Sequence, residues 1–270
     1  AKYKNLGVKT FQAEDEIAGI CSAIGASFAG NLGITTTSGP GFSLKGEALG
    51  LAIMTELPLV VVDVQRGGPS TGLPTKTEQS DLMQALYGRN GESPAVVIAC
   101  STPSNCFDWS FMASKITLEY NTPVILLSDG YLGNGSEPWK IKTIKDMPDI
   151  TPLIAKEGEN YQPYFRDKKT LARKLAIPGT KGLEHRLGGL EKEDISGNVS
   201  YDSENHEKMC NIRSEKIKKI SEIIPIQEVY GKTNADLLVI GWGGTYGSLY
   251  SSVDNLINEG KSIALTQFNY

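Results

Sequence analysis

The chain has 270 residues, of which 40% are hydrophobic and 21% are charged, as is usual for a globular protein. Its formal net charge of −4 and its lack of a basic run argue against nucleic-acid binding. The apolar stretch at residues 122–127 is far too short to cross a membrane, and we recognise no signal peptide. We therefore expect a cytoplasmic protein with one large domain, or with one domain and part of another.

The cysteines and histidines give no metal-site signature. The four cysteines (positions 21, 100, 106 and 210) are scattered and include no Cys-x-x-Cys pair. This pattern is typical of reduced thiols and argues against an iron–sulfur cluster carried by this chain alone. The two histidines, His185 and His206, fit no known ligand spacing, so we expect surface or interface histidines and assign no metal ligand.

Strand-like and helix-like segments alternate in the first half of the chain. The predicted strands cover residues 33–37, 57–64, 96–99 and 122–128. The predicted helices cover residues 11–29, 44–56 and 103–120. This alternation predicts an α/β fold with a mainly parallel sheet, right-handed connections and flanking helices.

The pattern changes in the second half. From about residue 140 to 224 prolines and charges are frequent and no periodicity is clear, which predicts an extended arm over the surface. A strand at 236–241, a helix at 245–258 and a strand at 262–268 then begin a second α/β unit. The glycine run between the first two is one residue too long for a dinucleotide fingerprint. We expect three parts, with further elements beyond both ends: a domain at 1–140, an arm at 141–224 and the start of a second domain at 225–270.

Two polar, glycine-rich loops follow predicted strands of the first sheet. The first is Ser38-Gly-Pro-Gly41, and the second begins at Arg66 and carries several hydroxyl groups. Ligands of open α/β sheets bind beyond the carboxyl ends of the strands. We therefore expect the binding site where these two loops meet.

Several motifs together resemble one enzyme family. They are EDE at 14–16, TSGPG at 37–41, QRGGPSTGLPTKTEQSDL at 65–82, TPVILLSDGYLGN at 122–134, and GLEHRLGG and DSENHEKM in the arm. The chain resembles, over nearly its whole length, the alpha subunit of the 2-oxoacid:acceptor (ferredoxin) oxidoreductases, most closely the 2-oxoglutarate type. The resemblance implies the pyrimidine-binding domain of a thiamine diphosphate enzyme, followed by the arm and the start of a transketolase C-terminal-like domain.

The resemblance assigns the catalytic carboxylate to Glu16, with Glu14 as the alternative. In the family this group hydrogen-bonds N1′ of the cofactor's aminopyrimidine. Such a partner favours the imino tautomer, whose nitrogen can accept the proton of thiazolium C2. The resemblance also places a cofactor-binding segment beside the pyrimidine, where glycines allow close approach to a flat ring. This segment consists of Ser38, Gly39, Pro40 and Gly41.

The resemblance also assigns substrate binding to the second loop. Arg66 matches the arginine that pairs with the 2-oxoacid carboxylate in relatives, because a guanidinium presents a fork to a carboxylate. The alternative is a structural arginine that bonds loop carbonyls. Four further polar residues of the loop are candidates for the distal carboxylate of a dicarboxylic substrate: Ser70, Thr71, Thr75 and Lys76.

The resemblance implies a shared active site. A beta subunit would supply the diphosphate–Mg²⁺ site and the 4Fe–4S cluster, a gamma domain or subunit would join them, and ferredoxin would accept electrons. The expected reaction is CoA-dependent oxidative decarboxylation of 2-oxoglutarate to succinyl-CoA, active only with the beta subunit. The alternatives are a subunit acting on pyruvate or branched-chain 2-oxoacids, and a non-catalytic scaffold. A YPITP-like segment of relatives, whose threonine touches substrate, is absent here and is expected before Ala1.

Overall fold

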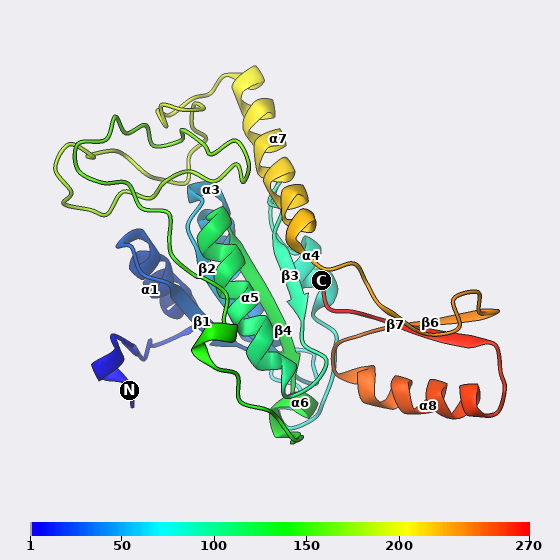
Figure 1. Cartoon of the computed structure of the whole chain (residues 1–270). Coiled ribbons are helices and arrows are strands. Elements are labelled where there is room, and N and C mark those ends of the chain that lie inside the picture. The colour runs from blue at the N-terminus through cyan, green and yellow to red at the C-terminus, as the bar shows by residue number, and fades with distance from the viewer. Residues whose placement is uncertain (1) are drawn as a thin grey trace.

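The computed structural model describes residues 2–270, and a four-stranded parallel sheet forms its centre (Figure 1). The strands are β1 (Gly33–Thr37), β2 (Leu59–Gln65), β3 (Val96–Ala99) and β4 (Pro123–Asp129). Their order is β1-β2-β4-β3, and every neighbouring pair is parallel, as predicted. The central strands β2 and β4 are buried along nearly their whole length, which explains their continuous apolar runs.

Helices cover both faces of this sheet. In chain order they are α1 (Glu16–Phe28), α2 (Gly39–Leu44), α3 (Gly46–Thr55), α4 (Leu82–Tyr87), α5 (Asn105–Tyr120) and α6 (Gly130–Asn134). On one face, Ile20 of α1 and Leu49 of α3 pack against Val61 of β2. On the other face, Ile116 of α5 packs with the neighbouring Val60. The alternation of side chains along β2 thus divides the core into two layers.

Three local predictions differ from the structure. Helix α1 begins at Glu16 rather than at residue 11, because the Asp15 side chain accepts a hydrogen bond from the Ala18 amide and caps it. The segment 38–41, expected to be a loop, continues into the first turn of α2. The helix expected at 44–56 is divided at Lys45 into α2 and α3. The short helices α4 and α6 were not predicted.

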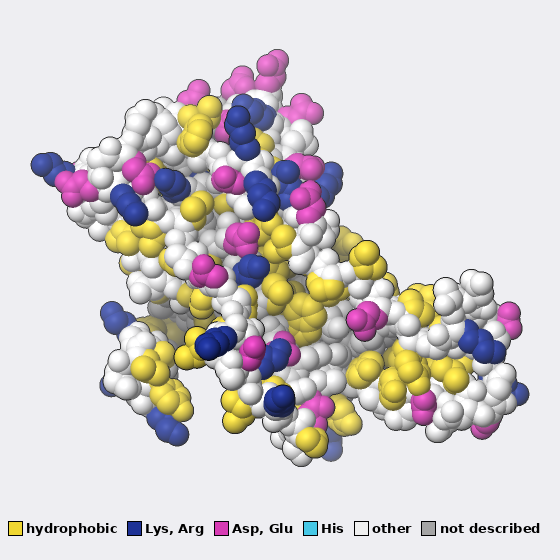
Figure 2. All heavy atoms as spheres, in the orientation of Figure 1, with side chains coloured by type: hydrophobic (Ala, Val, Ile, Leu, Met, Phe, Trp, Pro, Cys, Tyr) yellow, Lys and Arg dark blue, Asp and Glu magenta, His cyan; other side chains and the backbone are white. Residues whose placement is uncertain are grey.

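Between residues 141 and 202 the structure has one short 3-10 helix (Ile144–Asp146) and otherwise irregular backbone, whereas the last part of the expected arm is a long helix. Helix α7 (Ser203–Ile220) follows the arm, and Figure 1 shows it standing beside the sheet. Its buried face carries Arg213 and Lys216 as well as Met209 and Ile220, so it lacks the apolar period that marks a helix. Figure 2 shows charges of both signs mixed over the arm and α7, in keeping with this composition.

A buried ion-pair network holds the arm and α7 to the sheet domain. The carboxylate of Glu56, at the end of α3, lies 2.5 Å from Arg166 Nη2 and 2.5 Å from Lys216 Nζ. Burial would raise the pKa of Glu56, but the charges of Lys216 and Arg166 outweigh it and hold the pKa well below its usual range. We name these three residues the arm clasp.

The second α/β unit projects from the side of the first (Figure 1). It contains β5 (Val229–Gly231), β6 (Leu237–Trp242), α8 (Tyr246–Asn258) and β7 (Ile263–Phe268), with strand order β5-β7-β6. The unit joins the first sheet through Asn269, whose backbone oxygen accepts from Ala99 N at 2.7 Å. None of the described helices is both long and apolar enough to cross a bilayer.

Candidate functional site

The two predicted loops meet at the carboxyl ends of β1 and β2. A cavity of about 380 Å³ opens there. Gly39 and Pro40 form one part of its lining, and Arg66, Gly68, Pro69 and Ser70 form another. Two segments that are separate in the sequence therefore share one site.

The second loop folds back tightly on itself. Gly67 N donates to Lys76 O and Gly67 O accepts from Leu73 N, both at 2.8 Å. Gly72 has a φ of 48°, and a β-carbon there would lie 2.2 Å from the Gly67 oxygen. Only glycine therefore fits this turn, which fixes the backbone just after Arg66.

Arg66 is half-buried at the wall of this cavity. Within the described part of the chain, its buried Nε has no hydrogen-bond partner. A buried donor without an acceptor is costly, and a bound anion would relieve this cost. This observation favours an anion-binding arginine over the structural alternative.

The remaining candidates for substrate binding fall into two groups, those that line the cavity and those that do not. Ser70 lines the cavity together with Arg66. Thr71, Thr75 and Lys76 are exposed on the loop and are not part of the lining. The structure thus brings one of these four residues into the same cavity as Arg66.

Glu16 lies against the first turn of α2. A β-carbon built on Gly41 would come within 2.6 Å of Glu16 Cγ, 3.0 Å of Glu16 Oε1 and 2.2 Å of Thr37 Oγ1. The absence of a side chain at position 41 therefore makes room for the carboxylate. The structure brings Glu16 and the Ser38–Gly41 segment together, although the sequence separates them by more than 20 residues.

A buried lysine that the sequence analysis missed supports this arrangement. Lys45 Nζ donates to the backbone oxygen of Glu16 at 2.8 Å and to Thr35 Oγ1 at 3.1 Å. Burial lowers the pKa of Lys45, while the carboxylates of Glu16 and Asp15 oppose that shift. Lys45 thereby ties the start of α1 to β1 and positions Glu16. No sequence signal separated it from the exposed lysines.

A pair of acidic residues lies beneath the cavity. Asp63, on β2, is fully buried, and Asp81, which lines the cavity, is nearly so. Burial raises the pKa of Asp63 to about 8, and the neighbouring Asp81 carboxylate contributes to this shift. Burial also raises the pKa of Asp81. The carboxyl group of Asp63 therefore keeps its proton at neutral pH. Asp81 is in turn held through its backbone N, which donates to Gln65 Oε1 at 3.0 Å.

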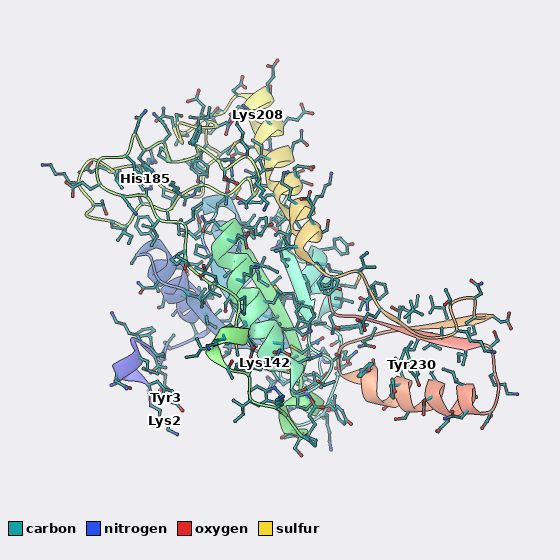
Figure 3. The ribbon with its side chains drawn as sticks, in the orientation of Figure 1. Lys2, Tyr3, Lys142, His185, Lys208 and Tyr230 are labelled. Carbon is teal, nitrogen blue, oxygen red and sulfur yellow. The ribbon has the colours of Figure 1, made fainter. Side chains whose placement is uncertain are left out.

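The histidines of the arm have different surroundings. His185 lies in the arm (Figure 3). Its Nδ1 is 2.9 Å from the Leu183 oxygen, and its ring packs edge-on against Tyr161. His206, on α7, lies instead with Glu92 and Cys210 in a group of potential metal ligands, the one such group found among the described residues. Among the described residues, His185 and His206 therefore do not belong to one group of potential metal ligands.

The parallel sheet, with its loops meeting beyond the strand ends, places the chain in the class of α/β proteins that bind a ligand at that edge. Residues 1–203 match the family model described as pyruvate flavodoxin/ferredoxin oxidoreductase, thiamine diphosphate-binding, and the chain belongs to this family. The fold and family predicted from the motifs are thus confirmed.

Comparison with individual relatives indicates which type of subunit the chain resembles. The chain is 56% identical over 271 residues to the 2-oxoglutarate oxidoreductase subunit KorA of Mycobacterium tuberculosis, an alignment that covers 100% of this chain and 41% of the relative. It is 35% identical over 262 residues to the 2-oxoglutarate synthase subunit KorA of Methanothermobacter marburgensis, covering 96% of this chain and 68% of the relative. The resemblance to alpha subunits of the 2-oxoglutarate type is therefore confirmed.

A solved structure has the same fold. It is the 2-oxoglutarate:ferredoxin oxidoreductase from Magnetococcus marinus with 2-oxoglutarate, coenzyme A and succinyl-CoA bound. The TM-score is 0.90 at 36% sequence identity, and the match covers 98% of this chain and 46% of that chain. The chain thus spans less than half the length of this protein and of the mycobacterial relative.

Proposed function

We propose that this chain supplies the pyrimidine side of a thiamine diphosphate site in a 2-oxoglutarate:ferredoxin oxidoreductase. The observation that carries the proposal is the position of Glu16 against Gly41, in the segment whose Gly39 and Pro40 line a cavity together with Arg66. The family is described as thiamine diphosphate-binding, and two of its relatives are named for 2-oxoglutarate.

The residues at this edge fit the cofactor. The cofactor supplies a carbon acid at thiazolium C2 that becomes a nucleophile once it is deprotonated. Glu16 would accept the hydrogen bond of the protonated N1′ and favour the imino form of the aminopyrimidine. The Ser38–Gly41 segment would lie beside the pyrimidine ring, and Gly41 would leave Glu16 the room to reach it. Lys45 would hold Glu16 in place from behind.

Arg66 would bind the C1 carboxylate of the 2-oxoacid. Its half-buried guanidinium faces a cavity that also contains Ser70. A charged, forked donor can fix both oxygens of a carboxylate and so orient the neighbouring carbonyl carbon. Thr71, Thr75 and Lys76, which are exposed, would contribute to a distal carboxylate only after the loop moves.

The complete enzyme requires partners. We propose that a beta subunit provides Mg²⁺, the diphosphate site and the 4Fe–4S cluster, that a gamma domain or subunit completes the assembly, and that ferredoxin accepts the electrons in the cytoplasm. We also retain residues 1–140, 141–224 and 225–270 as the proposed pyrimidine domain, arm and start of a transketolase C-terminal-like domain. Pyruvate or branched-chain 2-oxoacids are the alternative substrates, and a non-catalytic scaffold is the alternative role.

The test replaces the carboxylate in the assembled complex. In the Glu16→Gln variant, exchange of the C2 proton of bound thiamine diphosphate, followed by NMR in D₂O, should slow by orders of magnitude, whereas cofactor binding should persist. A Glu14→Gln variant is the matched control. Unchanged exchange in Glu16→Gln would refute the assignment. A screen of 2-oxoacids with CoA and a dye acceptor then identifies the substrate, and activity with none of them would favour a scaffold.

A further inference from the structure

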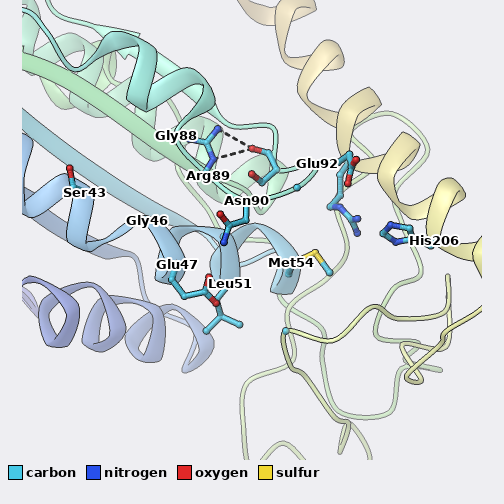
Figure 4. A pocket seen from close by; sticks show the side chains of 15 residues that line it. Ser43, Gly46, Glu47, Leu51, Met54, Gly88, Arg89, Asn90, Glu92 and His206 are labelled. Atoms are coloured by element: carbon cyan, nitrogen blue, oxygen red, sulfur yellow. Dashed lines mark hydrogen bonds between the residues drawn. The ribbon is translucent and has the colours of Figure 1, made fainter.

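Three potential metal ligands converge where α7 faces the loop before β3. His206 and Cys210 are four residues apart on α7 and therefore lie on the same face of the helix. Glu92 comes from the loop that joins α4 to β3. One donor atom from each of the three residues lies within 4.8 Å of the others. His206 and Glu92 also line a cavity of about 490 Å³ (Figure 4).

The imidazole of His206 is already oriented. Its Nδ1 lies 2.8 Å from Glu191 Oε2, a contact that in the neutral imidazole selects the tautomer with the proton on Nδ1 and the lone pair on Nε2. Histidine ligands of metals are commonly held in this way by a carboxylate on the other ring nitrogen. Glu191 is itself held by Arg213, whose Nη2 lies 3.1 Å from Glu191 Oε2. Glu191 and Arg213, which lie outside the group of three ligands, therefore hold the His206 ring in its orientation.

The separation of the ligand atoms suits a tetrahedral ion. His206 Nε2 lies 3.7 Å from Cys210 Sγ. Zinc bonds of about 2.3 Å to sulfur and about 2.0 Å to nitrogen, at a tetrahedral angle, place these two atoms about 3.5 Å apart. Cys210 Sγ is also 3.9 Å from His206 Nδ1, so the sulfur now lies over the ring. A different Cys210 rotamer would bring it to a metal bound at Nε2, and Glu92 would complete a set of three protein ligands, leaving the fourth position for water.

The charges of the cluster also fit a divalent cation. With a metal bound, Cys210 is a thiolate, so the ligand set carries two negative charges, one on Glu92 and one on Cys210. The net charge of two negative units would be balanced by one ion. Carboxylate, imidazole and thiolate together favour zinc over the hard cations magnesium and calcium.

We propose that Glu92, His206 and Cys210 bind one zinc-class divalent ion. The loop that carries Glu92 leads into the start of β3, so the site lies at the amino end of that strand, away from the carboxyl edge with Glu16 and Arg66. The ion would link the helix that ends the arm to the sheet domain. This proposal does not depend on the thiamine diphosphate site.

Zinc binding is tested on the full chain in its native complex, stripped with a chelator and titrated with Zn²⁺ against a chelating dye. Since Cys21 is exposed and lies outside the cluster, Cys21→Ser is the matched control for Cys210→Ser. We expect one site that is retained in Cys21→Ser and lost in Cys210→Ser and His206→Gln. Glu191→Gln, which leaves all three ligands in place, should weaken the affinity about 10- to 100-fold.

Alkylation of cysteines with and without Zn²⁺, mapped by peptide mass spectrometry, locates the site independently of activity. Zinc should protect Cys210 and leave Cys21 reactive. Protection of neither cysteine, or affinity that is unchanged in both His206→Gln and Cys210→Ser, would overturn the proposal. Either result would leave the Glu16 assignment untouched, because cofactor C2 exchange measures a different site.

Discussion

Gly41 and Glu16 are in such close contact that a β-carbon at position 41 would lie 2.6 Å from Glu16 Cγ. A separation below 3.0 Å cannot be accommodated unless something moves. The backbone of α2 is fixed by its own hydrogen bonds, so the groups that would be displaced are the side chains of Glu16 and of Thr37, whose Oγ1 would lie 2.2 Å away. The position of the proposed catalytic carboxylate is therefore set by the residue on which it packs.

The first prediction concerns this contact. Gly41→Ala should displace the Glu16 carboxylate and lower kcat/KM roughly 100-fold, the scale of loss that a misplacement of about 1 Å produces. Gly50→Ala, in α3, is the matched control, because a β-carbon there meets nothing within 4 Å. Thermal unfolding of both variants would show whether the fold survives. A folded Gly41→Ala enzyme with normal kcat/KM would contradict this role of Gly41.

The second prediction concerns Arg66. Removing the charged partner of a mostly buried carboxylate costs about 2–5 kcal/mol. At about 1.4 kcal/mol per tenfold, Arg66→Ala should lower kcat/KM for 2-oxoglutarate some 30- to several-thousand-fold. Arg66→Lys should recover only part, since an ammonium lacks the paired fork. Thiamine diphosphate affinity, measured in parallel, should change little. If cofactor affinity collapsed while kcat/KM per bound cofactor persisted, Arg66 would be a structural residue.

The third prediction uses the proton held by the buried carboxyl group of Asp63. The pKa of Asp63 is about 8 in the folded protein and about 4 in an unfolded chain. Between these values the folded state holds a proton that the unfolded state has lost. Stability should therefore fall as pH rises from about 4 to 8, by at most about 1.4 kcal/mol per pH unit.

Asp63→Asn imitates the protonated carboxyl group and should remove this fall. Urea unfolding at several pH values between 5 and 8 would measure the change, with the exposed Asp236→Asn as a control. The variant should gain stability over the native chain at pH 8 and little at pH 5. An equal difference at all pH values would mean that Asp63 does not hold a proton in this range.

The sequence predicted those elements in which the burial of side chains follows a simple pattern. Strands β2 and β4 are buried on both faces, so their β-branched runs predicted them to within two residues at either end. The loop that bears Arg66 was predicted for the same reason, since it follows β2. The segment 38–41 follows β1, whose burial alternates, and it enters α2 instead of forming the expected loop. The motifs of these loops then identified the family.

The features that were missed depend on contacts between distant residues. Helix α7 was predicted as part of an extended arm because its buried Lys216 looks like a surface lysine until it meets Glu56, 160 residues away. Lys45 is similar, because its acceptors lie on α1 and β1. The proximity of His206 and Cys210 also follows only once α7 is known to be a helix.

The last prediction concerns the arm clasp. The side chains of Lys216 and Arg166 are 2% and 7% exposed. In Glu56→Gln, Lys216 loses its partner charge and Arg166 keeps only the longer contact of 3.8 Å with Asp194. Breaking a buried pair by removing one member costs about 3–5 kcal/mol, because the remaining charges stay buried. The matched control is Glu159→Gln, which breaks the exposed pair with Lys174 and should change stability little. Urea unfolding measures both variants, and limited proteolysis reports on the arm, which should be cut faster when the clasp is broken. If Glu56→Gln unfolded at the same urea concentration as the control, the network would not be what holds the arm to the sheet domain.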